Sequence, residues 1–152
     1  MRVNIYTDGS CKGNQFYKEQ RVGGWGFVVV NCETDKEVFR SNADVIGTTN
    51  NRAELMAVMQ ATIYVLFNKK EVESAIIYSD SKYVVNALNL WRYGWEKNGW
   101  KTSNGKDVKN KILFEEIIKN INESDTPIRF IHIKGHAGNK WNEIADKLAK
   151  GE

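Results

Sequence analysis

The sequence contains few of the residues that mark specialised protein classes. Among its 152 residues there is one proline, and the two cysteines, Cys11 and Cys32, form no CxxC pair. Two thiols alone do not make a disulfide framework, which favours a reduced intracellular protein. No apolar run approaches the length of a transmembrane helix, and residues 1–6 lead directly into a strand pattern without room for a signal peptide. We therefore expect a cytoplasmic, monomeric protein with no membrane partner and a single domain over residues 1–152.

The net charge is also low, at +3, but it is unevenly distributed. Residues 91–111 contain six basic and two acidic side chains, whereas sixteen bases and seventeen acids leave the other residues at −1. A local basic segment is typical of polyanion binding, although a solvated helix face would have a similar composition. Four aromatic residues interleaved with the bases weaken the second interpretation; they are Trp91, Tyr93, Trp95 and Trp100.

Hydrophobic periodicity predicts an α/β fold. Strand patterns at residues 3–10, 25–31 and 38–45 are separated by turn residues, and such short gaps indicate an antiparallel meander. The period becomes helical after Asn50 and Asn51, which have the character of a helix start. Further strands are predicted at 75–79 and 128–133, and helices near 84–88, 108–121 and 142–150. This order gives a mixed five-stranded sheet with helices packed against it.

Four acidic residues lie where this fold would bring them together: Asp8, Glu54, Asp80 and Asp146. Asp8 and Asp80 follow strand patterns, Glu54 opens the first helix, and Asp146 lies on the last one. Carboxylates at strand ends and first helical turns converge at one edge of an open α/β sheet. Because four clustered carboxylates repel one another, the arrangement is costly unless cations fill it. Ligation by oxygen alone selects Mg²⁺ or Mn²⁺ over Zn²⁺.

Each acid also has a purely structural explanation. Glu54 fits a helix-capping arrangement, and Asp80 fits the N-cap of the helix that follows it. Asp146 can pair with Lys150 at a spacing of four, and Asp8 before a glycine suits a turn. Helix caps do not exclude metal ligation, and all four explanations would have to coincide to account for the pattern.

Seven short motifs occur in order along the whole chain. They are TDGSC (7–11) with GN (13–14), TNNRAEL (49–55), SDSKYV (79–84), GWKT (99–102), VKN (108–110), KGHAG (134–138), and NE (142–143) with ADKLA (145–149). Any single motif is weak evidence, but seven at compatible spacing are specific. Together they resemble type 1 ribonuclease H. The resemblance implies a ribonuclease H-like mixed sheet, with an antiparallel meander followed by β-α units, and a basic helical protrusion.

In that family, the residues that match Asp8, Glu54, Asp80 and Asp146 hold two divalent cations, usually Mg²⁺, with Mn²⁺ as an alternative. The resemblance therefore implies hydrolysis of the RNA strand of an RNA–DNA hybrid, leaving 3′-hydroxyl and 5′-phosphate ends. In the two-metal mechanism one cation activates the attacking water while the other stabilises the leaving 3′ oxygen. His136 matches a family residue on a mobile loop that assists proton transfer or product release. A zinc site at this histidine would need further ligands, and no paired thiols accompany it.

The resemblance also implies how substrate is held. Four residues match the family's nucleic-acid groove, where backbone and amide groups hydrogen-bond 2′-hydroxyls: Cys11, Asn14, Asn50 and Asn51. Thr49 matches a position near a DNA-strand phosphate, and Lys82 replaces a polar uncharged residue, which would tune phosphate contacts. The basic segment corresponds to the protrusion that grips the DNA strand, through Trp91, Trp95, Lys97, Trp100 and Lys101. Because Trp91 and Trp95 also fit one helix face, we expect at least one tryptophan to be buried and at least one to contact substrate.

Two segments depart from the family pattern. Residues 15–22 lack the short Gly/Pro turn that the family often carries there, so we expect a longer first hairpin. Lys140 and Trp141, before Asn142, are also unusual, and the sequence offers no interpretation of them.

Three other functions share part of the pattern. Another metal nuclease on the same architecture would not combine the Asn50–Asn51 pair with the basic segment. A phosphatase with Asp8 as nucleophile would carry a second aspartate at position 10, where Ser10 stands. A non-catalytic nucleic-acid binder would be expected to lose carboxylates, and all four are present. The sequence therefore favours a hybrid-specific ribonuclease.

Overall fold

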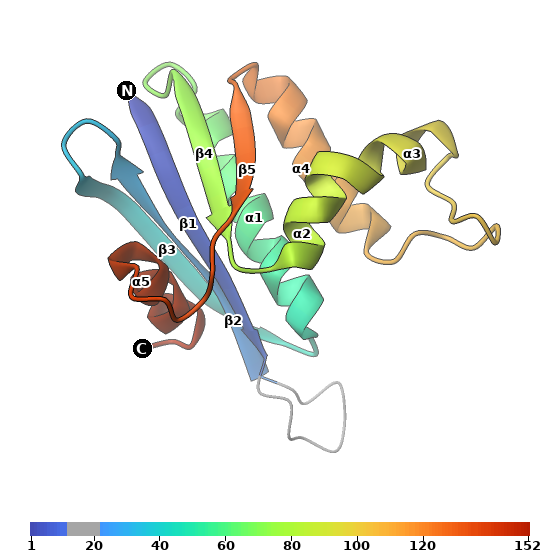
Figure 1. The fold of residues 1–152 in the computed structure, drawn as a ribbon, viewed down its shortest axis with the longest axis horizontal. Coiled ribbons are helices and arrows are strands. Elements are labelled where there is room, and N and C mark those ends of the chain that lie inside the picture. Colours follow the sequence, from blue (N-terminus) through green and yellow to red (C-terminus); the bar gives the residue numbers. More distant parts are fainter. Residues whose placement is uncertain (12–21) are drawn as a thin grey trace.

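The computed structural model describes residues 1–11 and 22–152, and its centre is a five-stranded sheet (Figure 1). The strands are β1 (Arg2–Cys11), β2 (Val22–Asn31), β3 (Lys36–Ile46), β4 (Ser74–Ser79) and β5 (Ile128–His132). They lie in the order β3-β2-β1-β4-β5, so β1 is central. The first three strands pair antiparallel, whereas β4 is parallel to both β1 and β5. The predicted mixed sheet with its antiparallel meander is confirmed; the expected long hairpin falls, except for Val22, outside the described residues.

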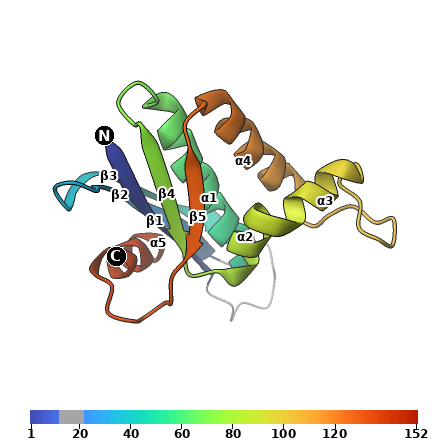
Figure 2. The same cartoon turned by 45° about the horizontal axis from the view of Figure 1, so that its top comes forward.

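Helices cover both faces of the sheet (Figures 1 and 2). They are α1 (Asn50–Phe67), α2 (Lys82–Asn86), η2 (Ala87–Trp91), α3 (Arg92–Lys97), α4 (Lys111–Ser124) and α5 (Lys140–Ala149). The helices α1 and α4 pack on one face and α5 packs on the other. In Figure 1, α3 lies beyond α2 and α4, away from the sheet. Within the described part of the chain, no helix combines the length and apolar character needed to cross a membrane.

Three helical features differ from the prediction. The helix α4 begins at Lys111 instead of residue 108, because Asn110 adopts a left-handed conformation with a φ of 63°. The helix α5 begins two residues earlier than predicted, because the Asn139 side chain caps it by accepting the N–H of Asn142 at 2.9 Å. The π-helical turn η2, between α2 and α3, has no signal in the sequence.

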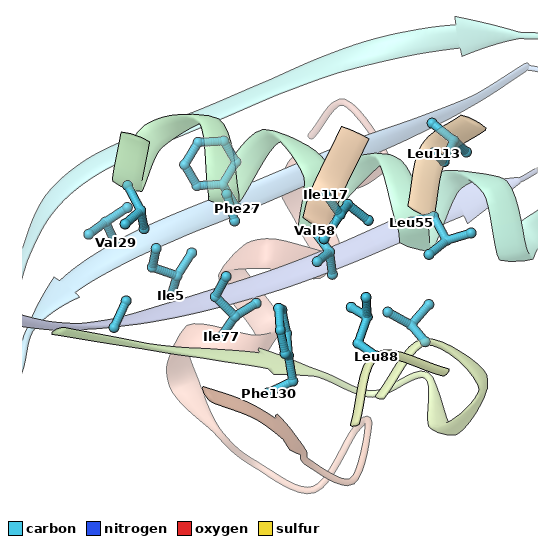
Figure 3. Close-up of a cluster of buried hydrophobic side chains, with 14 of the residues drawn as sticks. Ile5, Phe27, Val29, Leu55, Val58, Ile77, Leu88, Leu113, Ile117 and Phe130 are labelled. Carbon is cyan, nitrogen blue, oxygen red and sulfur yellow. The ribbon is translucent and has the colours of Figure 1, made fainter. Parts of the chain in front are cut away.

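The larger core lies between the sheet and the helices α1 and α4 (Figure 3). Alternate residues of the strands point into it, and Ile5, Val29 and Ile77 are at most 1% exposed. Leu55 of α1 and Phe114 of α4 meet them and are fully buried. Each such side chain contributes about 1.5–3 kcal/mol on burial, so this layer fixes where α1 begins relative to β1.

A smaller core lies on the other face, where α5 approaches β2 closely. Trp141 and Ala145 of α5 are buried there. The approach requires two glycines of β2. A Cβ on Gly26 would lie 2.6 Å from the Cβ of Leu148, and one on Gly24 would lie 2.4 Å from the backbone of α5. Since real Cβ atoms do not approach so closely, these two positions set the location of α5.

Trp141, which the sequence did not explain, fixes the first turn of α5 to the turn between β2 and β3. Its indole Nε1 donates to Asp35 Oδ1 at 3.2 Å. The Lys140 ammonium lies 4.5 Å from the centroid of the Trp141 ring, in a cation–π arrangement. This residue pair therefore anchors the helix that carries Asp146.

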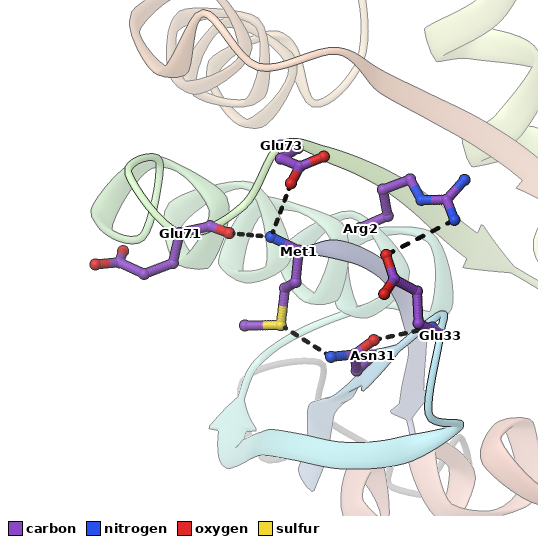
Figure 4. A network of polar contacts seen from close by, with 6 residues as sticks. All are labelled: Met1, Arg2, Asn31, Glu33, Glu71 and Glu73. Carbon is purple, nitrogen blue, oxygen red and sulfur yellow. Dashed lines mark hydrogen bonds and ion pairs between the residues drawn. The ribbon is translucent and has the colours of Figure 1, made fainter.

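Polar contacts at the end of the sheet where β1 begins hold Met1 and the first residues of this strand (Figure 4). The amino group of Met1 donates to the Glu71 carbonyl oxygen and lies 3.6 Å from the Glu73 carboxylate. Asn31 Nδ2 contacts the Met1 sulfur at 3.6 Å. Exposed ion pairs of this kind contribute about 0–1 kcal/mol each, so they define the strand end more than they stabilise the fold.

Candidate active site

Asp8 lies near the end of the central strand, beside a glycine that lets α1 approach. A Cβ on Gly9 would lie 2.3 Å from the carbonyl carbon of Ala53, so no other residue fits. The Gly9 N–H lies 3.0 Å from Asp8 Oδ1 and 2.8 Å from Glu54 Oε1, and donates to both carboxylates. The close approach of strand and helix therefore brings one acid of β1 against one acid of α1.

Glu54 is oriented by the sheet and not by its own helix. The N-cap of α1 is Thr49, whose Oγ1 accepts the Arg52 N–H at 3.3 Å. Glu54 instead receives the Gly9 N–H at Oε1 and the Ser79 hydroxyl at Oε2, the latter at 3.3 Å. The capping interpretation of Glu54 is therefore wrong, and its buried carboxylate points toward the ends of β1 and β4.

Asp80 follows β4 and is also not a helix cap. Ser81 caps α2, accepting the Val84 N–H at 3.2 Å, so the capping interpretation of Asp80 is wrong. The backbone of Asp80 is held from β5, since His132 Nε2 lies 3.2 Å from its carbonyl oxygen. A Cβ on Gly135 would lie 2.9 Å from Asp80 Oδ2, so this glycine leaves room for the carboxylate.

These three acids form one cluster, with ligand oxygens of Asp8, Glu54 and Asp80 all within 4.8 Å of one another. Burial, and then the charge of Glu54, raises the pKa of Asp8 well above its ordinary value. Burial also raises the pKa of Glu54, although hydrogen bonds from neighbouring groups work against it. Burial and the charge of Asp146 raise the pKa of Asp80. The cluster is therefore a buried site of mutual repulsion, which a bound divalent cation would relieve.

Asp146 lies beside this cluster but has a partner of its own. Lys150 Nζ donates to Asp146 Oδ2 at 3.0 Å, so the predicted i, i+4 contact is confirmed. Burial tends to raise the pKa of Asp146, but the hydrogen bonds from Lys150 and from the Asp8 carboxyl outweigh it and lower the pKa. The structure thus brings three of the four predicted acids into one tight group. The fourth, Asp146, lies beside the group and is hydrogen-bonded to Lys150.

His136 lies in the loop between β5 and α5. It is exposed and has a left-handed backbone conformation, with a φ of 55°. Its charge lowers the pKa of both Asp80 and Asp146, which places the imidazole within electrostatic reach of these two carboxylates. The ring is thus open to solvent and near the acids.

The predicted groove residues gather where β1 ends and α1 begins. The Cys11 thiol lies 3.4 Å from the Thr48 carbonyl oxygen, which puts the end of β1 beside Thr49. Asn50 and Asn51, in the first turn of α1, are exposed there. Lys82 begins α2 two residues after Asp80 and is exposed, whereas Asn14 falls outside the described residues.

The sequence does not predict a polar contact that joins the start of α1 to the start of α4. Arg52 Nη1 donates to Asn110 Oδ1 at 3.2 Å and joins the first turn of α1 to the start of α4. Asn110 Nδ2 in turn lies 3.4 Å from the Tyr83 hydroxyl. Both Arg52 and Asn110 stand in motifs of the sequence, but a contact across 58 residues is visible only in the fold.

The sequence predicts that at least one tryptophan of the basic segment is buried. This prediction is wrong, because none of Trp91, Trp95 and Trp100 is buried. Trp95 and Trp100 are half-buried against Phe114, with ring centroids 5.3 and 6.4 Å from it. Trp91 is 42% exposed, and its ring lies 6.0 Å from that of Trp95. Lys97 is exposed, and Lys101 donates to the exposed Asp107 carboxylate. Substrate contact by this segment stays a prediction.

Comparison with solved structures identifies the fold. The crystal structure of LC9-RNase H1, a type 1 RNase H with the type 2 active-site motif, superposes with a TM-score of 0.81 at 29% identity, covering 98% of this chain and 70% of that one. LC11-RNase H1, solved in complex with an RNA/DNA hybrid, gives a TM-score of 0.72 at 24% identity, covering 99% and 95%. The mixed sheet with helices on both faces is thus the fold of RNase H structures.

Sequence comparison gives the family. The RNase H family model matches residues 1–152. Ribonuclease H from Francisella tularensis subsp. novicida (strain U112) is 44% identical over 148 residues, covering 97% of this chain and 88% of that protein. The chain belongs to the RNase H family.

Proposed function

We propose that this protein is a metal-dependent endoribonuclease that hydrolyses the RNA strand of RNA–DNA hybrids. The observation that carries the proposal is the cluster of Asp8, Glu54 and Asp80, with oxygens within 4.8 Å, in a chain of the RNase H family. Among the described residues, no lysine or arginine forms an ion pair with these three acids. The hybrid bound to LC11-RNase H1, whose fold this chain shares, supports the choice of substrate.

The donor set fits a hard divalent cation. Three carboxylates converge without a thiol or imidazole nitrogen among them, which suits Mg²⁺ and also Mn²⁺. Asp8, Glu54 and Asp80 would hold one ion, and Asp8 with Asp146 would hold a second. When bound, these cations supply positive charge that favours ionisation of the attacking water and stabilises the leaving 3′ oxygen, leaving 3′-hydroxyl and 5′-phosphate ends.

The chain itself orients the carboxylates. Hydrogen bonds from Gly9 and Ser79 fix both oxygens of Glu54, so this side chain loses little freedom when a ligand binds. His132 fixes the backbone of Asp80. His136, exposed and near Asp80, carries a proton between the reacting phosphate and solvent. Loss of His136 should therefore slow turnover without abolishing it.

Substrate selection is assigned to two regions. Cys11, Asn14, Asn50 and Asn51 contact 2′-hydroxyls of the RNA strand, because only such contacts distinguish RNA from DNA. Thr49 and Lys82 contact phosphates beside the acids. The basic segment, residues 91–111, binds the DNA strand through Trp91, Trp95, Lys97, Trp100 and Lys101, with phosphate contacts from its lysines and stacking on the exposed indole of Trp91.

The test is cleavage of one labelled RNA sequence presented single-stranded, as an RNA duplex and as an RNA–DNA hybrid, with Mg²⁺ or with EDTA. A DNA duplex and the Asp80→Asn protein serve as controls. We expect cutting of the hybrid alone, dependent on Mg²⁺ and lost in the variant. Binding without cutting under each metal tried would favour the non-catalytic alternative. Cutting of the DNA duplex would contradict the substrate assignment.

A further inference from the structure

The fourth acid, Asp146, stands in an unfavourable place for a carboxylate. It lies in the last turn of α5, which ends at Ala149. Carbonyl groups at a helix C-terminus carry partial negative charge, so an anion there needs a positive neighbour. Lys150, the C-cap residue, supplies it at 3.0 Å, and both side chains are partly exposed, at 23% for Asp146 and 43% for Lys150.

The Lys150 ammonium also lies within electrostatic range of Asp8. The hydrogen bond to Asp146 comes first among the causes that raise the pKa of Lys150, and the charge of Asp8 contributes as well. Asp8 and Asp146 are the two carboxylates that would hold a second cation under the proposed function. The ammonium thus lies in the field of the same pair of acids.

Lys150 and Asp44 of β3 line the same cavity. It has a volume of about 140 Å³ and is lined by Ser10, Gly23, Asp44, Ala149, Lys150 and Gly151. Asp44 is exposed on β3, and among the described residues it forms no ion pair. The Lys150 side chain therefore has one acid on the side of the cluster and another across the cavity.

We propose that Lys150 is a resident counter-ion that occupies Asp146 when no cation is bound and turns toward Asp44 when a second cation binds. The proposal rests on the proposed function, because it concerns the cation held by Asp8 and Asp146. Lys150 competes with that cation and therefore raises the concentration of divalent cation at which the second site is filled. Its hydrogen bond also holds the Asp146 side chain in place in the metal-free protein.

The expected effect is moderate, because the pair is partly exposed. An i, i+4 ion pair on a helix surface changes an equilibrium constant by about two-fold. Removal of the ammonium also removes its repulsion of an incoming cation, so we expect the second cation to bind about two- to five-fold more tightly. The first cation, held by Asp8, Glu54 and Asp80, should be affected less.

The test is calorimetric titration of the free protein with MnCl₂, which reports binding without any turnover. The Lys150→Met variant removes the charge and keeps the length of the side chain. Lys147→Met, one turn earlier on the exposed side of α5, is the matched control, because it removes an equal charge without touching Asp146. We expect tightening of the weaker binding step in Lys150→Met only. Equal tightening in both variants, or none in either, would overturn the proposal.

Two further variants locate the effect. In an Asp146→Asn background, Lys150→Met should change Mn²⁺ binding less than in the wild-type background, because the ion pair is already gone and only the repulsion between the ammonium and the cation remains. An effect of the same size in both backgrounds would show that the ion pair with Asp146 plays no part and would contradict the proposal. Asp44→Asn should weaken the second binding step by up to about two-fold, because the displaced ammonium loses its alternative partner. An unchanged affinity would overturn the role of Asp44.

The outcome separates this proposal from the proposed function. If the wild-type protein binds Mn²⁺ and cuts the hybrid while Lys150→Met titrates as the wild type does, only the role of Lys150 fails. If the wild-type protein binds no Mn²⁺ at all, the proposed function fails first. Thermal unfolding in EDTA checks that each variant is folded before it is titrated.

Discussion

The acid cluster and the basic segment are two charged regions of opposite sign, and they are built in opposite ways. Asp8, Glu54 and Asp80 are partly or fully buried, with Asp8 4% and Glu54 8% exposed, and the Gly9 N–H orients the first two carboxylates. The lysines of residues 91–111 are mostly exposed, on a short helix and the loop that follows it. Chemistry at one phosphate needs fixed ligands, whereas attraction to a polyanion needs only nearby charge. The two regions should therefore respond differently to mutation.

The largest effect should come from the cluster. Asp80→Asn removes one negative ligand oxygen but keeps the size of the side chain, so we expect at least about a 100-fold loss of hybrid cleavage. Hybrid binding should be retained, because the basic segment is untouched. Single-turnover cleavage and filter binding measure the two effects. Asp125→Asn, at the exposed end of α4, is the control and should behave as the wild type. Unchanged turnover in Asp80→Asn would disprove the metal assignment.

Gly9 and Gly94 should respond in opposite ways to replacement by alanine. Gly9→Ala places a methyl group 2.3 Å from the backbone of α1, so we expect a loss of about 1–3 kcal/mol in unfolding free energy and a displaced Glu54. Gly94→Ala, in α3 with nothing within 4 Å, should gain about 0.5–1 kcal/mol instead. Urea unfolding measures both. Equal effects would mean that the approach of α1 to β1 is not as close as described.

Without bound metal, the stability of the protein against unfolding should depend on pH. Because the pKa values of Asp8, Glu54 and Asp80 are raised in the folded protein, the unfolded chain loses these protons first as pH rises. Stability in EDTA should therefore fall as pH rises from about 4, through the pKa of Glu54 at about 7 and toward that of Asp8 at about 10, by at least roughly 1–3 kcal/mol. The lowered pKa of Asp146 works in the other direction and is outweighed. Urea midpoints should show this fall in EDTA and a smaller one in MgCl₂; no difference between the two would contradict cation binding at the cluster.

The smallest effect should come from the basic segment. Replacing Lys97, Lys101 and Lys106 by Ala should raise KM several-fold, leave kcat nearly unchanged, and reduce the slope of log affinity against log salt by up to about 3. The reduction should fall short of this limit because Lys101 is bonded to Asp107.

The control for the basic segment is a triple replacement elsewhere on the surface. Lys69, Lys70 and Lys119 are exposed outside residues 91–111, and their replacement removes the same total charge. An equal change in salt slope for both triple variants would show that net charge, and not this segment, draws the hybrid.

Features set by local patterns could be predicted from the sequence, and features set by contacts between distant residues could not. Strand and helix periods, and acids at strand ends, are local patterns, and they predicted the mixed sheet and the convergence of Asp8, Glu54 and Asp80. The orientation of each acid was not predictable, because Glu54 and Asp80 are held by residues of other strands. Trp141 remained unexplained for the same reason: its partner, Asp35, lies 106 residues away. The burial of the tryptophans is overestimated from the sequence, since helical spacing does not reveal how far Phe114 covers Trp95 and Trp100.

The close packing of α5 on the sheet has a consequence for how the molecule folds. The helix α5 closes on β1 and β2, and the Ser10 hydroxyl donates to the Ala149 carbonyl oxygen at 2.8 Å across 139 residues of chain. Such distant contacts carry a high loop-closure entropy and form late. During refolding, the sheet and α1 should therefore protect their amides from exchange before α5 does. Asp146 joins the other three acids only in that last phase, so a chain that is largely folded remains without its complete set of carboxylates.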